Sequence, residues 1–478
     1  MLDISRDNVI ARIGRENPWW RSADKLPYAS MRPRPYLKQL VELMISDVRR
    51  AVILMGPRRV GKTVMLHHAV KELIAANEAS PKNFCFISVD HPLYNNLPLQ
   101  DFLDLYRETT GVEYEMERCF FIFDEIQYMR DWERHLKVLV DSYPNLKFVA
   151  SGSAAAALKL KSNESGAGRF TDLLLPPLTL YEYVLLRGVE GLFDDCCEEK
   201  GAGRWRANVA SISSSDRMSE INGHFLDYLN FGGYPEVALN PAIQDDPGRF
   251  IKNDIVDKVL LRDLPSLYGI ENIQELNYLF TTLSYNTAGE VSLESLSSHS
   301  GVAKNTIKKY IEYLEAAFLI KTVNKVDINA RRFKRATAFK VYLTNPSIRS
   351  ALFAPLAEKD EAELGNLVET AVFSQWFHSP DTGLYYARWP KGELDMVYLG
   401  ARLDAQWAIE VKWSDAYLER PEKLKEQVAF CKRNGLKQLT VTSRNILAGT
   451  ELDEVEIEFV PAALYCYALG RDILNRRG

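Results

Sequence analysis

The sequence has few cysteines and no long apolar segment. Six cysteines occur among 478 residues, and no set of them has the spacing of a zinc site. The only close pair, Cys196–Cys197, is adjacent, so we expect reduced thiols and a cytoplasmic protein. No apolar run approaches the roughly 20 residues of a membrane-spanning helix, and the N-terminal stretch lacks the pattern of a signal peptide. We therefore expect no membrane partner.

An excess of charge of one sign is also missing. The formal net charge is −5, with 26% charged and 46% hydrophobic residues. A chain that is basic throughout is excluded, so any surface that binds nucleic acid has to be local. The composition is that of a globular protein with a real core, and the length predicts about three domains.

The clearest chemical motif lies near the N-terminus. The apolar residues 51–55 predict a buried strand, residues 56–63 match G-x-x-x-x-G-K-T, and a helix is expected next. In this context backbone N–H groups surround phosphates, Lys62 contacts the β- and γ-phosphates, and the Thr63 hydroxyl coordinates Mg²⁺. The predicted nucleotide-binding residues are Gly56, Pro57, Arg58, Arg59, Val60, Gly61, Lys62, Thr63 and Val64.

A second motif agrees with the first. Four apolar residues, Phe120–Phe123, precede Asp124 and Glu125. We expect Asp124 to hold the Mg²⁺ shell and Glu125 to act as general base on the attacking water. A polar residue after the next predicted strand, Ser151 or Ser153, is expected between the water and the γ-phosphate.

Strand-like runs occur at 51–55, 84–89, 120–123 and 147–150, with helical stretches between them. This alternation is typical of an α/β protein with a doubly wound parallel sheet. In such sheets the ligand lies at the C-terminal ends of the strands, where the two motifs above are expected to meet.

Together these motifs resemble the AAA superfamily of P-loop ATPases. The segments GPRRVGKT, FFIFDEIQ, ASGSAAAAL, GRFTDLLLPPLTLYEY and YLNFGGYPEVAL resemble more closely a prokaryotic family in which this ATPase precedes a C-terminal domain long labelled of unknown function. The resemblance spans residues from about 35 to 445. It implies ATP hydrolysis, with ATP and Mg²⁺ as ligands.

The resemblance also points to arginines. Arg169 lies where this family keeps a Gly-Arg pair and is expected to act on the γ-phosphate as a sensor or finger. Pairing with surface acids is an equally good reading of Arg169, and Arg262 is a second finger candidate. A finger supplied by a neighbouring chain would imply a homo-oligomer.

The middle of the chain predicts two different parts. Residues 186–220 are polar and rich in glycine and serine, so we predict a mobile insertion followed by a helical lid. From residue 291 the pattern of helix, Gly301 turn, helix and strand is similar to a winged helix. The predicted domains are 1–185 (ATPase), 186–285 (insertion and lid), 286–350 (winged helix) and 351–478 (C-terminal domain).

A local basic tract accompanies the predicted winged helix. Lys304, Lys308 and Lys309 start its second helix, at the end that enters the major groove in DNA-binding versions of this fold. The tract continues with Arg331, Arg332, Lys334, Arg335, Lys340 and Arg349, without an acid among them. Basic side chains of this kind suit DNA phosphates, although winged helices also serve as lids or protein-contact modules in ATPases.

The C-terminal region predicts helix, strand, strand, strand, helix and strand. Glu369 lies in the helix, Asp395 in the second strand, and the strand WAIEVKWS carries Glu410 and Lys412 on one face. This order resembles the PD-(D/E)XK nuclease fold, in particular its Holliday-junction-resolvase-like branch. The resemblance implies an α/β restriction-endonuclease-like domain that acts on DNA.

The chemistry of such a nuclease explains the spacing. Asp395 and Glu410 offer carboxylates to Mg²⁺, Val411 its carbonyl, and Glu369 a contact through water. Lys412 would orient the metal-bound water or contact the phosphate. These residues predict metal-dependent cleavage of DNA.

Alternatives remain at this site. The segment GELD replaces the usual Pro-Asp, so Glu393 competes with Asp395 as metal ligand. An active nuclease, an inactive relic that binds nucleic acid, and unrelated charge pairs are all compatible with the pattern. The leading hypothesis is an ATPase coupled to a nuclease-like domain, and the alternative is a regulatory ATPase switch whose C-terminal domain only binds protein or DNA.

Overall fold

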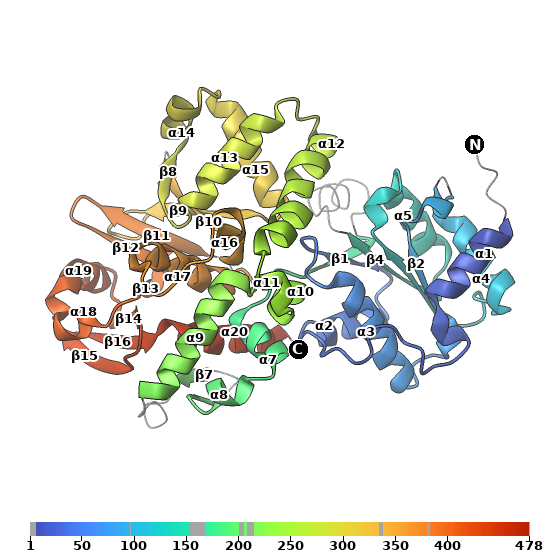
Figure 1. The fold of residues 1–478 in the computed structure, drawn as a ribbon, viewed down its shortest axis with the longest axis horizontal. Coiled ribbons are helices and arrows are strands. Elements are labelled where there is room, and N and C mark those ends of the chain that lie inside the picture. The colour runs from blue at the N-terminus through green and yellow to red at the C-terminus, as the bar shows by residue number, and fades with distance from the viewer. Residues whose placement is uncertain are drawn as a thin grey trace. The chain divides into compact units, whose positions relative to one another are not determined.

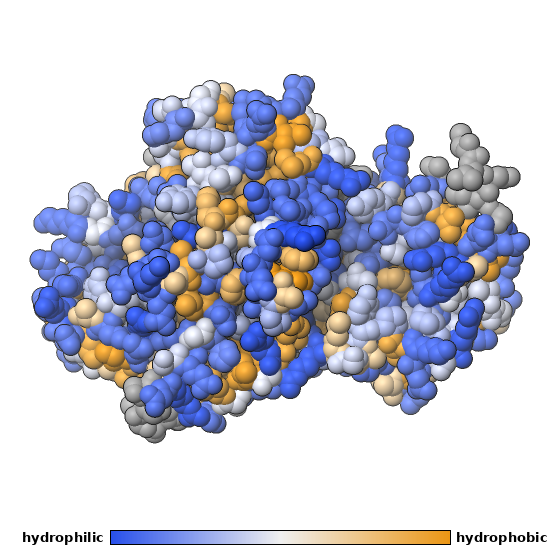
Figure 2. Space-filling model, viewed as in Figure 1, coloured by the Kyte–Doolittle hydropathy of each residue, from blue (hydrophilic) through white to orange (hydrophobic). Residues whose placement is uncertain are grey.

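A computed structural model describes the chain as two compact units, residues 1–176 and 177–477 (Figure 1). The described residues are 6–95, 97–152, 168–199, 205–207, 215–333, 338–379 and 383–477. All six cysteines are free and buried. Within the described ranges, no helix is long and apolar enough to cross a membrane. The face drawn in Figure 2 is mainly hydrophilic, with small apolar patches.

The first unit is built on a parallel five-stranded sheet of order β2-β3-β4-β1-β5. Its first four strands are apolar and buried, as expected where helices cover both faces of a sheet. The predicted doubly wound P-loop fold is therefore confirmed. The strands are β1 (Ala51–Met55), β2 (Phe84–Ser88), β3 (Cys119–Asp124), β4 (Leu146–Gly152) and β5 (Phe170–Leu174).

Helices flank this sheet, and alternation along the strands divides its core in two. Ile53, Phe121 and Phe123 point to one face, where they pack with residues of the first, fourth and fifth helices. The second and third helices pack against each other, and the third contacts β4. The helices are α1 (Arg6–Glu16), α2 (Leu37–Ile45), α3 (Lys62–Ala75), α4 (Leu99–Thr110) and α5 (Trp132–Ser142).

The second unit contains a mixed nine-stranded sheet of order β15-β16-β14-β13-β12-β11-β9-β10-β8. β9 pairs in parallel with β11, so the sheet continues across the predicted domain boundary at residue 350. The strands are β8 (Glu290–Ser292), β9 (Ile320–Val326), β10 (Ala338–Leu343), β11 (Leu384–Trp389), β12 (Gly392–Leu399), β13 (Ala405–Glu410), β14 (Gln438–Ser443), β15 (Ala448–Leu452) and β16 (Val455–Pro461).

Three helices of this unit position the residues of interest. α14 (Leu293–Ser300) is capped by Gly301, whose φ of +72° suits glycine, and α15 (Lys304–Ala316) follows. The helix, turn, helix and strand predicted from residue 291 correspond to α14, Gly301, α15 and β9, and a winged helix stays a prediction. α17 (Glu361–Trp376) is the helix predicted to carry Glu369.

The second unit contains further helices and two short strands outside the nine-stranded sheet. Two consecutive stretches have π-helical hydrogen bonding, η6 (Gly248–Asp257) and η7 (Val259–Asp263). The other α-helices and β-strands are α7 (Leu180–Arg187), α8 (Glu190–Asp194), β6 (Cys197–Glu199), β7 (Trp205–Ala207), α9 (Ser215–Phe231), α10 (Pro235–Leu239), α11 (Pro241–Gln244), α12 (Leu264–Tyr268), α13 (Ile273–Tyr285), α16 (Ser347–Leu352), α18 (Ala416–Glu419), α19 (Lys425–Arg433) and α20 (Ala462–Arg477).

The prediction that residues 186–220 form a mobile insertion is wrong for part of that range. Phe193, Cys196 and Cys197 are buried in the main core of the second unit. Buried cysteine behaves as a small hydrophobic residue. These side chains therefore anchor an otherwise polar segment to the core.

Candidate functional site

The predicted nucleotide loop begins where β1 ends. Gly56 lies so close to the backbone of Leu175 in the same unit that a Cβ at this position would be 2.2 Å from the Leu175 carbonyl oxygen. Gly61 has a φ of +92° and caps the N-terminus of α3, which begins at Lys62. Both glycines are therefore required by the backbone, as expected for a loop whose N–H groups surround phosphate.

Lys62 lies inside this loop. Its ammonium donates to the carbonyl oxygens of Gly56, at 3.0 Å, and Pro57, at 2.8 Å. Burial lowers the pKa of Lys62, while the nearby Glu125 and Asp124 oppose the change. The ammonium is thus held at the loop by neutral acceptors and can be offered to an anionic ligand.

The sheet brings the second motif to the same edge. β4 lies between β1 and β3, so Ser151 at its end is next to both the loop and Asp124. The Thr63 hydroxyl donates to Asp124 Oδ2 at 2.6 Å, and the Ser151 hydroxyl donates to Asp124 Oδ1. Burial raises the pKa of Asp124, against these two hydrogen bonds. A hydroxyl and a carboxylate are hard oxygen donors, so Thr63 and Asp124 fit Mg²⁺.

Glu125 follows Asp124 with a left-handed backbone, at a φ of +55°. This conformation is uncommon for a residue with a side chain and turns the chain sharply after the strand. The Glu125 N–H donates to Ser151 Oγ at 3.4 Å, and Gln127 donates to the Glu125 carboxylate. Glu125 is therefore at the site predicted for it, with Gln127 as a partner that the sequence did not suggest.

Arg34 is a second residue that the motifs did not suggest. It is buried, and it donates to the carbonyl oxygens of Val60, at 2.9 Å, and Pro176, at 3.0 Å. These two hydrogen bonds hold the nucleotide loop in position. Within the loop, Arg59 has a left-handed φ of +65°, and Arg58 donates to the Tyr128 hydroxyl at 3.5 Å.

Arg169 is not at this edge of the sheet. Its carbonyl accepts from Ala51 N–H, at the start of β1, and its guanidinium pairs with Asp141. The loop begins at the other end of β1, about 16 Å away at the usual rise of a strand. The predicted sensor role within the same chain is therefore wrong, and only action on a neighbouring chain stays a prediction. Ser153 lies outside the described residues.

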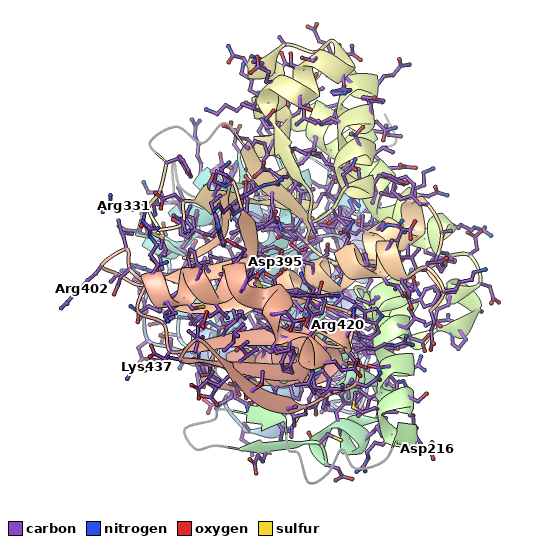
Figure 3. All side chains as sticks on the ribbon, turned by 90° about the vertical axis from the view of Figure 1, so that its left-hand side faces the viewer. Asp216, Arg331, Asp395, Arg402, Arg420 and Lys437 are labelled. Carbon is purple, nitrogen blue, oxygen red and sulfur yellow. The ribbon has the colours of Figure 1, made fainter. Side chains whose placement is uncertain are left out.

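In the second unit, the residues predicted for a nuclease meet in one buried cluster. Glu369 comes from α17, Asp395 from β12 and Glu410 from the end of β13, and Lys412 is the second residue after that strand. Figure 3 shows Asp395 inside the unit, while Arg331 and Arg402 project outward. The four residues are brought together as the resemblance implied.

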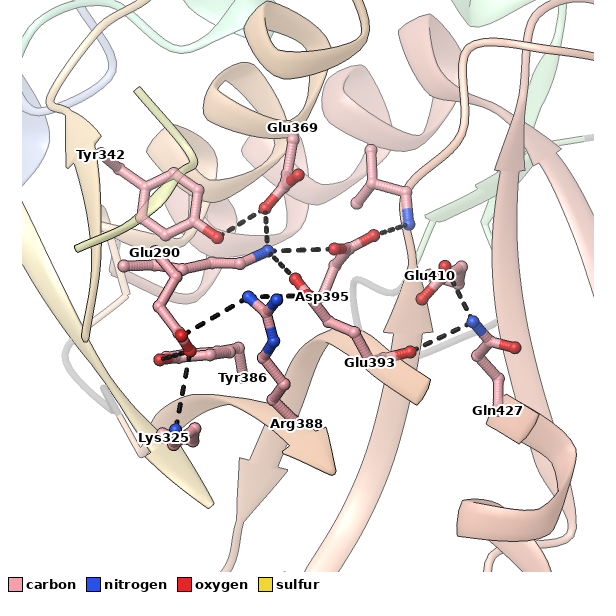
Figure 4. Close-up of polar contacts among 12 residues, drawn as sticks. Glu290, Lys325, Tyr342, Glu369, Tyr386, Arg388, Glu393, Asp395, Glu410 and Gln427 are labelled. Carbon is pink, nitrogen blue, oxygen red and sulfur yellow. Dashed lines mark hydrogen bonds and ion pairs between the residues drawn. The ribbon is translucent and has the colours of Figure 1, made fainter. Parts of the chain in front are cut away.

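Lys340, from β10, lies among these acids. Its ammonium is 2.9 Å from Glu369 Oε1, 2.7 Å from Glu393 Oε1 and 3.1 Å from Asp395 Oδ1. The Tyr342 hydroxyl, two residues further along β10, donates to the same Glu369 oxygen at 2.6 Å. These contacts are drawn in Figure 4.

Lys412 lies on the other side of Asp395. Its ammonium is 2.6 Å from Glu410 Oε1 and 3.7 Å from Asp395 Oδ2, and it donates to the Val411 carbonyl at 3.2 Å. Thr442 on β14 fixes its backbone, because the Thr442 hydroxyl accepts from Lys412 N–H and donates to Lys412 C=O. The backbone N–H of Val411 donates to Asp395 Oδ2 at 2.9 Å.

The cluster has strongly perturbed pKa values. Burial and the nearby Asp395 raise the pKa of Glu369 to about 7 and that of Glu410 to about 8. For Asp395, burial opposes ionisation, but Lys340 and Lys412 outweigh it and lower its pKa. For Lys340, burial is outweighed by Glu369 and the other anionic neighbours, so its pKa is raised. The two lysines therefore stay charged and Asp395 stays ionised at neutral pH.

A metal ion does not fit this arrangement as it stands. Across the described part of the chain, no group of three or more His, Cys, Asp or Glu side chains is arranged to hold a metal ion. Asp395, Glu369 and Glu393, which were predicted to supply or compete for metal ligation, face Lys340 instead. One oxygen, Glu410 Oε2, is buried without a hydrogen-bond partner among the described residues.

The basic tract divides into exposed and buried members. Lys304, Lys308 and Lys309 on α15 are exposed, as are Arg331 and Arg332. Lys304 pairs with Glu294 at 2.9 Å, and Lys308 lies 3.9 Å from Glu312.

Other members of the tract cannot be surface contacts. Lys340 and Arg349 are buried, so the prediction that they contact phosphate is wrong. Lys334 and Arg335 lie outside the described residues.

Comparison with known proteins gives a match to a described family in the first unit. Residues 48–184 match a family model described as an AAA domain. Together with the parallel sheet and the loop geometry, this match supports an AAA-type P-loop ATPase domain in the first unit. Residues 222–360 match a model described as a domain of unknown function, DUF8612.

Two curated relatives carry names that describe them only as uncharacterized proteins. One, from Haemophilus influenzae, is 23% identical over 436 residues, which cover 89% of this chain and 96% of the relative. The other, from Methanocaldococcus jannaschii, is 25% identical over 345 residues, covering 70% of each.

Among solved structures, the Walker-type ATPase PABY2304 of Pyrococcus abyssi aligns with 14% identity and a TM-score of 0.35, covering 69% of this chain and 97% of that one. The ORC2 protein of Aeropyrum pernix aligns with 15% identity and a TM-score of 0.37, covering 70% and 92%.

Proposed function

We propose that this protein is an ATPase that binds ATP with Mg²⁺ at the P-loop of its first unit and hydrolyses it. The observation that carries the proposal is the 2.6 Å contact between the Thr63 hydroxyl and Asp124. These residues are 61 positions apart, and they are the two that a P-loop ATPase uses to hold its metal ion.

The other residues of the site divide the chemistry between them. Lys62 exchanges its loop carbonyls for the β- and γ-phosphates, because a charge-assisted contact with an anion is stronger than one with a neutral oxygen. Bound Mg²⁺ would neutralise charge that develops on the phosphates. Glu125 takes the proton of the attacking water, and Ser151 fixes the orientation of Asp124.

Two variants test this proposal in the full chain. Lys62→Ala should abolish nucleotide binding at micromolar ATP, whereas Glu125→Gln should still bind ATP but release phosphate about 10²-fold or more slowly. Phosphate release and binding of a fluorescent ATP analogue are the measurements. Lys71→Ala is the control, because Lys71 is an exposed lysine on the same helix. Unchanged turnover in Lys62→Ala would contradict the proposal.

A second function, binding of DNA by the second unit, is supported by the exposed lysines of α15. Lys304, Lys308 and Lys309 occupy the first two turns of the helix that follows the Gly301 turn. The ion pairs of Lys304 with Glu294 and of Lys308 with Glu312 are at the surface, where such pairs contribute little and can be exchanged for phosphates. We infer that the nucleotide cycle of the first unit controls a second unit that binds DNA.

The test is a comparison of two triple variants with the same change of charge. Replacing Lys304, Lys308 and Lys309 by alanine should weaken binding to duplex or branched DNA and reduce the slope of log K against log [salt] by up to about 3. Replacing Lys425, Lys432 and Lys437, exposed on another part of the same unit, should leave that slope unchanged. Equal losses in both variants would refute a specific role for α15.

Whether the protein assembles into a homo-oligomer stays a prediction. Arg169 and Arg262 are both at least partly exposed, as a residue offered to a neighbouring chain has to be. A finger arginine of this kind stabilises charge on the γ-phosphate of the adjacent chain.

A further inference from the structure

We infer that Lys340 is a built-in cation that takes the place of a divalent metal ion in the carboxylate cluster of the second unit. The cluster in this chain therefore keeps its shape without metal. The inference concerns the second unit alone and goes beyond the proposed hydrolysis of ATP by the first.

The contacts of the Lys340 ammonium are those that a metal ion would need. Three carboxylates, from Glu369, Glu393 and Asp395, approach it within 3.1 Å. They come from one helix, α17, and one strand, β12, and they converge on one point (Figure 4). A lysine offers three donors: Lys340 donates to Glu369 and Asp395, and it forms an ion pair with Glu393.

The remaining oxygens that could ligate a metal are mostly taken by Lys412. Its ammonium contacts Glu410 Oε1 and the Val411 carbonyl. Asp395 Oδ2 already accepts the Val411 N–H. Glu410 Oε2 is the one oxygen of these groups that lies buried and unpartnered among the described residues. The two ammonium groups thus contact at least one oxygen of each of the four carboxylates, and the Val411 carbonyl as well.

The position of Lys340 is fixed by the sheet. β10 lies between β9 and β8, and Lys340 is in register with Val323 on one side and Glu290 on the other. Its side chain is only 4% exposed, and its ammonium lies 5.5 Å from the centre of the Tyr386 ring. The lysine therefore belongs to the folded core and is not a mobile surface group.

Removal of this charge has a defined consequence. Buried carboxylates that lose their partner are strongly destabilising, so they demand another cation. Oxygen ligands of this kind suit Mg²⁺ or Mn²⁺. Lys340→Met should consequently turn the cluster into a metal site that the wild-type chain does not have.

The experiment counts Mn²⁺ ions bound to the full chain without nucleotide, by titration calorimetry and by the electron paramagnetic resonance of free Mn²⁺. The wild type gives the baseline, which includes any ion held at Thr63 and Asp124. Lys340→Met should bind one further Mn²⁺ per chain, and the melting temperature of its second unit should rise with Mn²⁺ where that of the wild-type second unit does not. Lys340→Met combined with Asp395→Asn should lose the extra ion.

Lys325→Met is the matched control, since Lys325 lies on the adjacent strand and contacts Glu290 at 3.7 Å. It should bind Mn²⁺ as the wild type does. If Lys340→Met alone does not fold, Lys340→Met with Glu369→Gln removes one charge of each sign and should restore the fold and gain the ion.

Two results would overturn the inference. The first is a wild-type chain that already binds a Mn²⁺ ion that Asp395→Asn removes. The second is a folded Lys340→Met variant, single or double, that gains no ion. ATP turnover measured on the same samples reports separately on the first unit.

Discussion

His67 lies on α3 within the aromatic core of the first unit. Its ring centre is 4.5 Å from that of Phe86 and 5.6 Å from that of Trp19. Nδ1 is buried without a hydrogen-bond partner among the described residues. Burial, with the nearby His68 as a smaller cause, lowers the pKa of His67 from 6.5 to about 4. This histidine is thus a neutral core residue.

The lowered pKa predicts how stability depends on pH. Between pH 6.5 and 4 the unfolded chain protonates His67 and the folded chain does not, so stability falls as the pH decreases through this window. His67→Phe keeps the aromatic packing and removes the proton, so the fall between pH 7.5 and 5 should be smaller by about 2 kcal/mol. Urea unfolding of the first unit at the two pH values measures the difference.

The control for His67 is His135→Gln, because His135 is an exposed histidine on α5 of the same unit. Its pH dependence should match that of the wild type. An equal pH dependence in His67→Phe and the wild type would show that the folded state also accepts the proton.

At the scale of elements, the buried strands of the first unit were predictable. β1, β2 and β3 contain continuous apolar runs, β4 is mainly apolar, and such runs between helical stretches indicate parallel strands. β5 was not predicted, because its sequence FTDLL is short, mixed and only partly buried at the sheet edge. Its pairing with β1 is what places Arg169 at the wrong end of the sheet for the nucleotide.

The cluster in the second unit was predictable only in part. Glu369, Asp395, Glu410 and Lys412 follow a known order of elements, and they do meet. The sequence suggested that Lys340 belongs to an exposed basic tract. Its burial depends on a strand pairing between segments that are distant in sequence.

That pairing joins β9 to β11, at Lys325 with Tyr386 and Val326 with Ala387. Register between strands so far apart in sequence is set by the folded sheet and leaves no local signal. The sequence indicates only that Lys340 and Tyr342 lie on the same face of β10. It does not indicate which residues pack against that face.

At the scale of the whole molecule, each unit has a core of its own. One core cluster contains only residues of the first unit, and two others contain only residues of the second. A unit with its own core can unfold as a cooperative element. We therefore expect two calorimetric transitions in the full chain.

Nucleotide binding should separate these transitions. At 100 times its dissociation constant, a non-hydrolysable ATP analogue with Mg²⁺ stabilises the unit that binds it by about 2.7 kcal/mol. For a unit of about 170 residues this raises the melting temperature by roughly 5–11 °C. The transition of the first unit should move, and that of the second unit should stay, because the P-loop, Asp124 and Ser151 all lie within residues 1–176. Lys62→Ala should remove the shift, whereas Lys71→Ala should keep it. A single transition, or an equal shift of both, would mean that the two units unfold together and that nucleotide binding is felt across the chain.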